Sequence, residues 1–202
     1  KLIRVNSNGT VDVIGEIGND NAPVTFDYSF DYLAVASNND LFLYDGVTLT
    51  QVTDVDLGNV LDFVWIDGYF VTTDGSFLVV TELNDPFAVS PLKYGSSEVS
   101  PDPIIAVLKL RNEIYAVNRY SIEVFANVGG DLFPFQRING ALIERGAIGN
   151  KACAVFMDSI VFVGSAQKES IGVYLGVNGQ SQKISTREID QVLASYTDTQ
   201  LS

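Results

Sequence analysis

The sequence contains 25 aspartate and glutamate residues and no histidine. Carboxylates are therefore the first side chains to consider for a catalytic role. A glycosidase-type pair requires two acids roughly 5–9.5 Å apart, one of them with a raised pKa. Aspartate also occurs in turns, where its side chain accepts hydrogen bonds from the local backbone. The turn positions here are Asp40, Asp45, Asp54, Asp67, Asp74 and Asp85. We therefore expect no catalytic residue, and the lack of histidine excludes Ser-His-Asp, Cys-His and His-zinc mechanisms.

Metal and phosphate sites are also not indicated. Asp54-Val55-Asp56 and Asn38-Asn39-Asp40 offer oxygen ligands, but neither has the spaced acidic series and distant glutamate of a calcium loop. The glycine-rich, lysine-containing pattern of a phosphate loop does not occur. Cys153 lies in an apolar run, which is typical of a buried, unreactive thiol. We expect no metal and no cofactor.

The charge of the chain disfavours electrostatic binding to nucleic acid. The net charge is −13. Residues 1–100 hold 3 basic and 15 acidic side chains, a net of −12, whereas residues 101–202 hold 9 and 10, a net of −1. An acidic surface repels phosphate backbones.

One loop has the composition of a protein contact. Between Asn127 and Arg137, two glycines are followed by apolar side chains around a proline. The loop either tucks its aromatic side chains into the core or exposes them to a partner subunit, with Arg137 in the polar rim. The candidate contact residues are Leu132, Phe133, Phe135 and Arg137. Residues 86–103, which contain four prolines, predict a second long loop.

The elements that would position these residues are β-hairpins. Leu2–Val5 and Thr10–Ile14 flank an Asn-Gly turn, and Tyr69–Thr72 and Phe77–Val80 flank Asp74-Gly75. Further pairs are Tyr32–Val35 with Leu41–Tyr44, Ile114–Val117 with Ile122–Phe125, and Ile160–Val163 with Ile171–Tyr174.

The hairpins recur as a repeat. The residues that open four of them are Asp31, Gly68, Glu113 and Ser159, at spacings of 37, 45 and 46. About four strands per unit of this length are typical of a β-propeller blade. We expect an all-β fold, a β-propeller or propeller arc of about four to five blades; a β-sandwich is the alternative. The expected units are residues 26–59, 60–103, 104–147 and 148–184, after a partial unit at 1–25.

A C-terminal helix follows the repeats. Ile189, Val192, Leu193 and Tyr196 form one apolar stripe. The spacing of Ser185 and Glu188 predicts a capping box. We expect residues 185–202 to form an amphipathic capping helix, packed on the β body, and an exit segment.

The order of these segments resembles a known family. The resemblance rests on Trp65–Gly75, on Ser97-Glu98 before Pro101–Ile105, on Ser121–Phe125 and on Ser185–Tyr196. In order and spacing, from about Leu2 to Thr197, the chain is similar to the packaged-DNA stabilisation proteins, or tail accessory (hub or nozzle) factors, of short-tailed double-stranded DNA phages.

This resemblance implies a non-catalytic structural protein of the virion, made in the host cytoplasm and located in the tail or at the head–tail junction. Members of the family form a ring, with six copies in the type case, below the portal adaptor. They extend the DNA channel, help to retain packaged DNA and hold the tail needle and tailspikes. They are longer than 202 residues, so we expect a segment of a longer chain. The implied partners are other copies, these virion proteins and passing duplex DNA, without a membrane.

Within this implied role, the acidic half would form a channel wall that repels DNA and lets the duplex slide. The residues expected on this acidic face are Asp40, Asp45, Asp54, Asp56 and Asp74. Two other functions remain open from the residues alone: a non-viral propeller scaffold and a carbohydrate-binding propeller. The latter requires exposed aromatic side chains beside a carboxylate in a central pocket.

Overall fold

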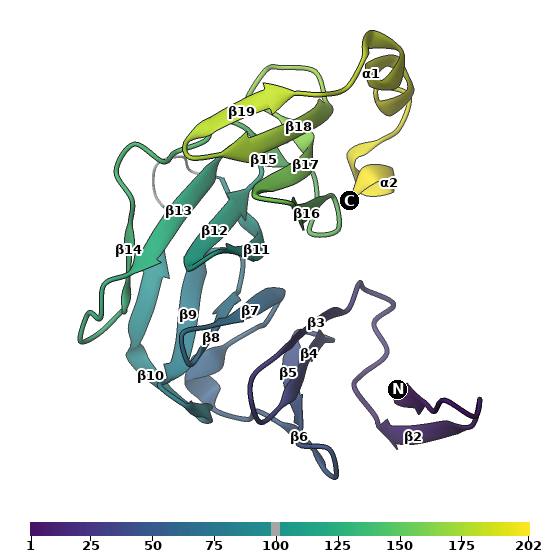
Figure 1. The fold of residues 1–202 in the computed structure, drawn as a ribbon, viewed down its shortest axis with the longest axis vertical. Helices are drawn as coiled ribbons and strands as arrows, with labels where there is room; N and C mark the ends of the chain where they lie inside the picture. Colours follow the sequence, from purple (N-terminus) through teal and green to yellow (C-terminus); the bar gives the residue numbers. More distant parts are fainter. Residues whose placement is uncertain (98–101) are drawn as a thin grey trace.

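The computed structural model describes residues 1–97 and 102–202 as a series of antiparallel sheets (Figure 1). A two-stranded hairpin comes first and is followed by four larger sheets. The all-β expectation is confirmed. Glu98 and Pro101, two residues of the sequence resemblance, lie outside the described residues. None of the helices in the described ranges is long and apolar enough to span a membrane.

The strands follow the chain in simple up-and-down order. The hairpin pairs β1 (Leu2–Val5) with β2 (Val11–Gly15). The first sheet contains β3 (Thr25–Tyr28), β4 (Leu33–Ser37), β5 (Asp40–Tyr44) and β6 (Leu49–Gln51), and the short 3-10 helix η1 (Val55–Leu57) follows. The second contains β7 (Asp62–Ile66), β8 (Tyr69–Thr73), β9 (Phe77–Glu82) and β10 (Asp85–Ser96).

The third sheet contains β11 (Ile104–Leu110), β12 (Glu113–Asn118), β13 (Ile122–Asn127) and β14 (Phe135–Arg137). The fourth contains β15 (Gly146–Ala147), β16 (Cys153–Phe156), β17 (Ser159–Ser165), β18 (Gly172–Val177) and β19 (Gln180–Lys183), with β15 and β16 both pairing with β17. The second and third sheets lie within the expected units 60–103 and 104–147, whereas β3 begins one residue before the unit 26–59 and β15 precedes the unit 148–184. The unit boundaries themselves stay a prediction.

The hydrophobic core is divided into layers between successive sheets. In the described part of the chain, four clusters of buried residues lie in chain order. Leu2 and Ile17 pack against the first sheet, and the next three clusters join sheets one to two, two to three and three to four. Because strand side chains alternate between faces, a middle sheet is apolar on both. The strand Glu113–Asn118, for example, sends Ile114 to the second sheet and Tyr115 to the fourth.

The segment expected as a second long loop is instead mostly strand. Residues 85–96 form β10, which lies at the outer edge of the second sheet and, among the described strands, pairs with β9 alone. The pairing is irregular between Asp85 and Val89 and again before Tyr94. Proline lacks a backbone N–H, but an edge strand with bulges leaves such positions unpaired. Pro86 and Pro91 are therefore compatible with this strand.

The C-terminal segment differs from the expectation in its cap and its packing. Helix α1 spans Arg187–Leu193 and begins after Thr186, not after Ser185. The Ser185 hydroxyl instead donates to Asp190 Oδ1 (2.6 Å) and accepts from the Val173 N–H (3.0 Å). No residue of α1 is buried, so polar contacts rather than the apolar stripe attach the helix. A second short helix, α2 (Asp198–Leu201), occupies the expected exit segment.

Candidate functional site: polar contacts between the inner strands

Figure 1 shows the sheets following one another along an arc, with β3, β7 and β11 toward its inner side. These three strands contact one another in sequence, and β16 contacts β11. The first residue of β7 is Asp62, which is only 4% exposed. Its carboxylate accepts from Thr25 Oγ1 of the first sheet (2.6 Å) and from the Val107 N–H of the third sheet (2.8 Å). One buried side chain therefore joins three sheets.

The fourth sheet reaches the same cluster through Lys151, which precedes β16. Its Nζ donates to Thr25 Oγ1 at 2.7 Å. Burial raises the pKa of Asp62, against the opposing effects of the hydrogen bonds from Thr25 and Val107 and of the Lys151 charge. The Thr25 hydroxyl thus accepts a hydrogen bond from the Lys151 ammonium group and donates one to the Asp62 carboxylate.

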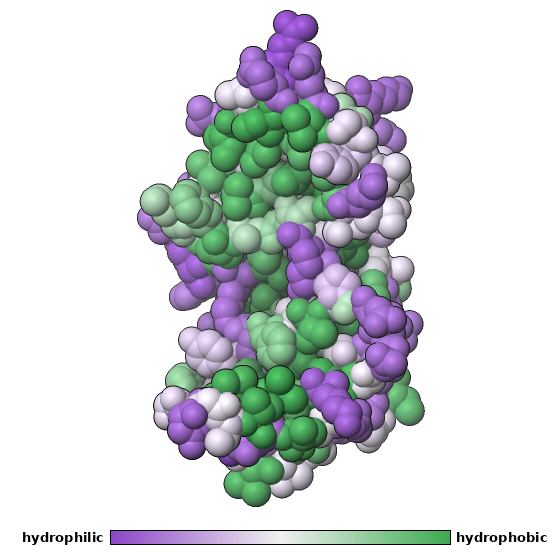
Figure 2. Space-filling model, turned by 90° about the vertical axis from the view of Figure 1, so that its right-hand side faces the viewer, coloured by the Kyte–Doolittle hydropathy of each residue, from purple (hydrophilic) through white to green (hydrophobic). Residues whose placement is uncertain are grey.

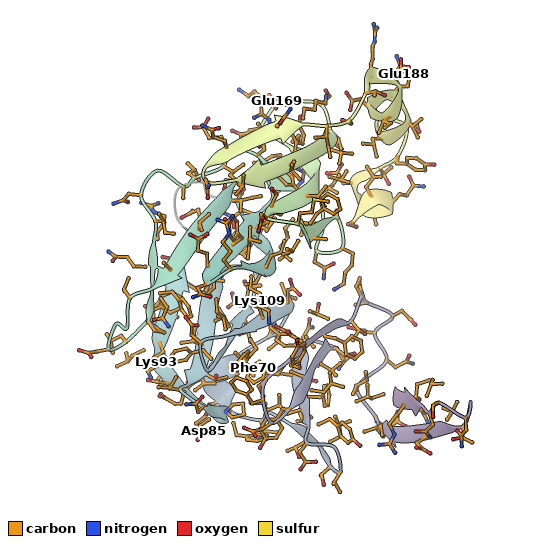
Figure 3. All side chains as sticks on the ribbon, in the orientation of Figure 1. Phe70, Asp85, Lys93, Lys109, Glu169 and Glu188 are labelled. Atoms are coloured by element: carbon orange, nitrogen blue, oxygen red, sulfur yellow. The ribbon has the colours of Figure 1, made fainter. Side chains whose placement is uncertain are left out.

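A second carboxylate repeats this arrangement further along the inner strands. Asp27 of β3 accepts from the Trp65 N–H of β7 at 2.7 Å. Lys109 of β11 donates to both Asp27 oxygens (2.9 and 2.7 Å) and to the Trp65 carbonyl (3.0 Å). Its Nζ also lies 5.8 Å from the ring centre of Tyr28. Figure 3 shows Lys109 near the middle of the molecule, where these strands approach one another.

The two carboxylates follow one rule: an inner-strand aspartate accepts the backbone N–H of the next inner strand. Sequence reasoning missed Asp27, Asp62 and Lys109 because their partners are 37 to 82 residues away. The available signal was the presence of aspartate within strand-like segments, where that residue is depleted.

The polar groups of this cluster connect the sheets to one another. The oxygens of Asp27 and Asp62 accept hydrogen bonds that hold sheets together. Burial raises the pKa of the neighbouring Cys153 thiol to about 12, with a further contribution from the charge of Asp62. The protonated thiol is a much weaker nucleophile than the thiolate, so a cysteine with this raised pKa is unreactive at neutral pH. No group of three or more His, Cys, Asp or Glu that could hold a metal occurs among the described residues.

The expected contact loop lies between the second and third sheets. Phe135 is buried and makes an edge contact with Tyr69, with ring centres 5.9 Å apart. The half-buried ring of Phe133 lies over Gly95, where any side chain would collide with it. Leu132 is exposed. The aromatic side chains thus fix the loop to the protein and leave Leu132 at the surface.

Arg137 lies on the exposed part of β14, and its guanidinium is 3.4 Å from the buried carboxylate of Glu123. It therefore has a contact within the third sheet while its side chain stays accessible. A partner contact through Leu132 and Arg137 stays a prediction.

Four of the five acidic-face residues lie at one edge of the sheets. Asp40 begins β5, Asp54 and Asp56 follow β6, and Asp74 follows β8, all at the edge where the inner strands start. Asp45 follows the end of β5 and lies at the opposite edge. Asp45 and Asp74 each accept two backbone N–H groups of their own turns. Those turn bonds lower the pKa of Asp45.

A pocket of about 370 Å³ opens at this same edge, between loops of all four sheets. Its wall is mainly aliphatic and includes Val60, Leu61 and Ile104, with Asn38 and Asn150 among its polar groups. None of its lining residues is aromatic. A sugar-binding platform of stacked rings is therefore not formed there.

Comparison with known proteins covers the whole chain. Residues 1–202 match the family described as bacteriophage P22 Gp10, β-propeller. The chain is 27% identical over 189 residues to the tail hub protein gp10 of Salmonella phage P22, which covers 84% of this chain and 39% of the relative. It thus spans about two fifths of that relative's length. A chain of a solved S. cerevisiae complex of Dbp5, Nup159 and Gle1 has a TM-score of 0.49 at 10% identity, over 83% of this chain and 45% of the other.

Proposed function

The chain belongs to the bacteriophage P22 Gp10 β-propeller family, and from that premise we propose that it is a structural component of a phage tail. The polar contacts of the inner strands support this proposal more than any other feature. Thr25, Asp62, Val107 and Lys151 join all four sheets at their inner side, and such a construction favours rigidity over catalysis. The proposed location is the virion, at the tail or head–tail junction, after synthesis in the host cytoplasm.

The proposed role within the tail is to extend the DNA channel below the portal adaptor and to help retain packaged DNA. Other copies of the protein form the ring, six in number by analogy with the family, and the tail needle and tailspikes are the further proposed partners. Because Asp62, Thr25 and Lys151 meet at the inner strands, duplex DNA would pass beside the sheets and not between them. The net charge of −12 over residues 1–100 supports a wall that does not bind the duplex.

Immunogold electron microscopy of purified virions tests the proposal. Antibodies raised against this chain are expected to label a single vertex, at the head–tail junction or tail. Particles from a strain lacking the gene, or pre-absorption of the antibody with the purified chain, provide the control. Absence of label on both intact and disrupted particles, with the protein free in the lysate, would show that the proposal is wrong.

A further inference from the structure

Three Asn-Gly pairs occur in the sequence, and the structure places each of them in a turn. The first turn joins β1 to β2, the second follows β14, and the third joins β18 to β19. The side chains of all three asparagines are exposed. The pairs are Asn8-Gly9, Asn139-Gly140 and Asn178-Gly179.

An asparagine before glycine can lose the ammonia of its side chain without a catalyst. The glycine nitrogen attacks the side-chain amide carbon, a new C–N bond closes a five-membered succinimide, and ammonia leaves with the proton of that nitrogen. Water then opens the ring to aspartate, or to isoaspartate, in which the main chain runs through the side-chain methylene. Glycine favours the attack because it has no Cβ, and asparagine is among the thermolabile residues. The glycine N–H and the asparagine amide must both be free to move.

The Asn8 turn restrains both groups. The Gly9 N–H donates to the Asn6 carbonyl at 2.9 Å. Asn8 Oδ1 accepts from the Thr10 N–H (3.0 Å) and from Thr10 Oγ1 (2.7 Å). Figure 2 faces the side of the molecule that carries this hairpin, and its lower half mixes hydrophilic and hydrophobic groups at the surface. Asn8 is therefore restrained by hydrogen bonds, not by burial.

The Asn139 turn leaves both groups free. Among the described residues, neither the Asn139 amide nor the Gly140 N–H has a hydrogen-bond partner. One bond closes the turn, from the Ala141 N–H to the Ile138 carbonyl at 3.2 Å. A Cβ built on Gly140 would meet no atom within 4 Å. The glycine nitrogen thus has room to approach the asparagine side chain.

The Asn178 turn is intermediate. Within the described part of the chain, the Asn178 amide also lacks a hydrogen-bond partner, but the backbone of the turn is fixed by packing. A Cβ built on Gly179 would lie only 2.4 Å from the Gly140 carbonyl oxygen. Val177 and Gln180 pair directly across the turn. The main-chain rotation that closes a succinimide is therefore more restricted here than at Asn139.

We propose that Asn139 is a site of spontaneous deamidation in the folded protein, that Asn178 reacts more slowly, and that Asn8 is the slowest of the three. The dipeptide and its exposure are the same at each site, so the order follows from hydrogen bonding and packing.

The product would change the contact between the third and fourth sheets. Either product adds a negative charge at residue 139, and isoaspartate also lengthens the main chain by one methylene group. The Gly140 carbonyl packs against Gly179, and Ile143, a few residues further on, is buried and pairs with Ile122. A finished virion does not resynthesise its proteins, so the modification would accumulate with particle age; this last consequence alone rests on the proposed function.

Peptide mapping of the purified chain tests the inference. The folded chain is incubated at mildly alkaline pH in oxygen-18 water, so that each new carboxylate carries the label, and mass spectrometry follows the three peptides separately. The same chain unfolded in urea gives the rate of each site without structure. Asn139→Gln removes the proposed fast site, because glutamine would have to close a larger ring. Asn8→Gln, also at an exposed turn, is the matched control.

In the folded chain, Asn139 is expected to convert at least tenfold faster than Asn8, which corresponds to about 1.4 kcal/mol of activation free energy, with Asn178 between them. The three rates are expected to converge in urea. Most of the ammonia release should be lost in Asn139→Gln and retained in Asn8→Gln.

Two results would overturn the inference. One is an Asn8 that converts as fast as Asn139 in the folded chain. The other is an unequal order that persists in urea, because the neighbouring residues and not the fold would then set the rates. Neither result changes where antibodies label the virion, so the proposed function is judged separately.

Discussion

Replacing Asp62 by alanine is expected to destabilise the protein strongly, because its carboxylate connects the first, second and third sheets. The substitution removes the acceptor of two hydrogen bonds, from Thr25 Oγ1 at 2.6 Å and from the Val107 N–H at 2.8 Å. The Val107 N–H is buried and would be left without that partner. The alanine methyl group is smaller than the carboxylate side chain and has no atom that can accept either hydrogen bond.

The magnitude follows from these contacts. Hydrogen bonds to a charged group contribute about 1.5–3 kcal/mol each, and an unsatisfied buried donor costs about 1–3 kcal/mol. The alanine variant no longer has to bury a charged carboxylate, and the desolvation free energy that this saves offsets part of the lost stability. We expect the free energy of unfolding to fall by about 3 kcal/mol, which lowers the Tm of a chain of this size by about 6–12 °C.

Asp62→Asn separates the geometry of the side chain from its charge. The amide keeps an acceptor for the Val107 N–H and offers its own N–H to Thr25, so the expected loss is below about 1 kcal/mol. Burial raises the pKa of Asp62 in the folded protein. The folded state therefore holds the proton more tightly, so the stabilisation that comes from this proton is fully present below the unfolded pKa and is lost as pH rises through the raised value, whereas the hydrogen bonds to the Asp62 oxygens remain. Over that window, stability should fall with rising pH more steeply in the wild type than in Asp62→Asn.

The assay is urea unfolding followed by the fluorescence of Trp65, the only tryptophan of the chain. Trp65 lies on the same inner strand and donates its backbone N–H to Asp27. Asp56→Ala, at an exposed aspartate, is the matched control and is expected to change stability by less than about 0.5 kcal/mol. An Asp62→Ala protein within about 1 kcal/mol of the wild type would refute the idea that this carboxylate holds the sheets together.

Three further predictions concern other parts of the molecule. Phe135→Ala is expected to cost about 3–4 kcal/mol because the ring is buried beside Tyr69, whereas exposed Leu132→Ala should cost less than about 0.5 kcal/mol; equal costs in urea unfolding would contradict the inward packing of the loop. Half-buried Cys153, with its pKa raised to about 12, should react with a disulfide reagent at pH 8 at least tenfold more slowly in the folded than in the unfolded chain, and equal rates would contradict the desolvation of its thiol. In a mobility-shift assay at low salt, the chain should not bind duplex DNA up to about 100 µM, a concentration at which nonspecific DNA-binding proteins are bound; a salt-sensitive shift would contradict the role of the acidic half.

The hairpins could be predicted from sequence because both the turns and the strands follow local rules. Asp74-Gly75 fixes a turn by its own chemistry, and the flanking strands, β8 and β9, begin at Tyr69 and Phe77 as expected. The repeat then indicates the propeller, since a β-sandwich has no reason to place such hairpins at similar intervals. The family match is consistent with that choice.

The edge strand β10, the start of helix α1 and the contacts between sheets could not be predicted, because they depend on long-range contacts that local sequence patterns do not contain. Pro86 and Pro91 suggest a loop unless the segment is known to lie at a sheet edge. Ser185 has the spacing of a helix cap, but the Val173 N–H and Asp190 compete for its hydroxyl. The aspartate contacts across sheets were missed for the same reason: only the fold brings Asp62 to Val107, 45 residues away.

The layered core also determines how the molecule would respond to mechanical load. The hairpin lies at one end of the series and is joined to the rest by its contact with the first sheet, whereas the first and fourth sheets are also connected directly through Lys151 and Thr25. Among the described residues, the interface between the hairpin and the first sheet holds four buried side chains, whereas each of the other clusters holds at least ten. Under tension the hairpin would detach first, before any of the larger sheets separate from its neighbour. A tail assembled from such chains would therefore yield at the hairpin while the four-sheet body stays intact.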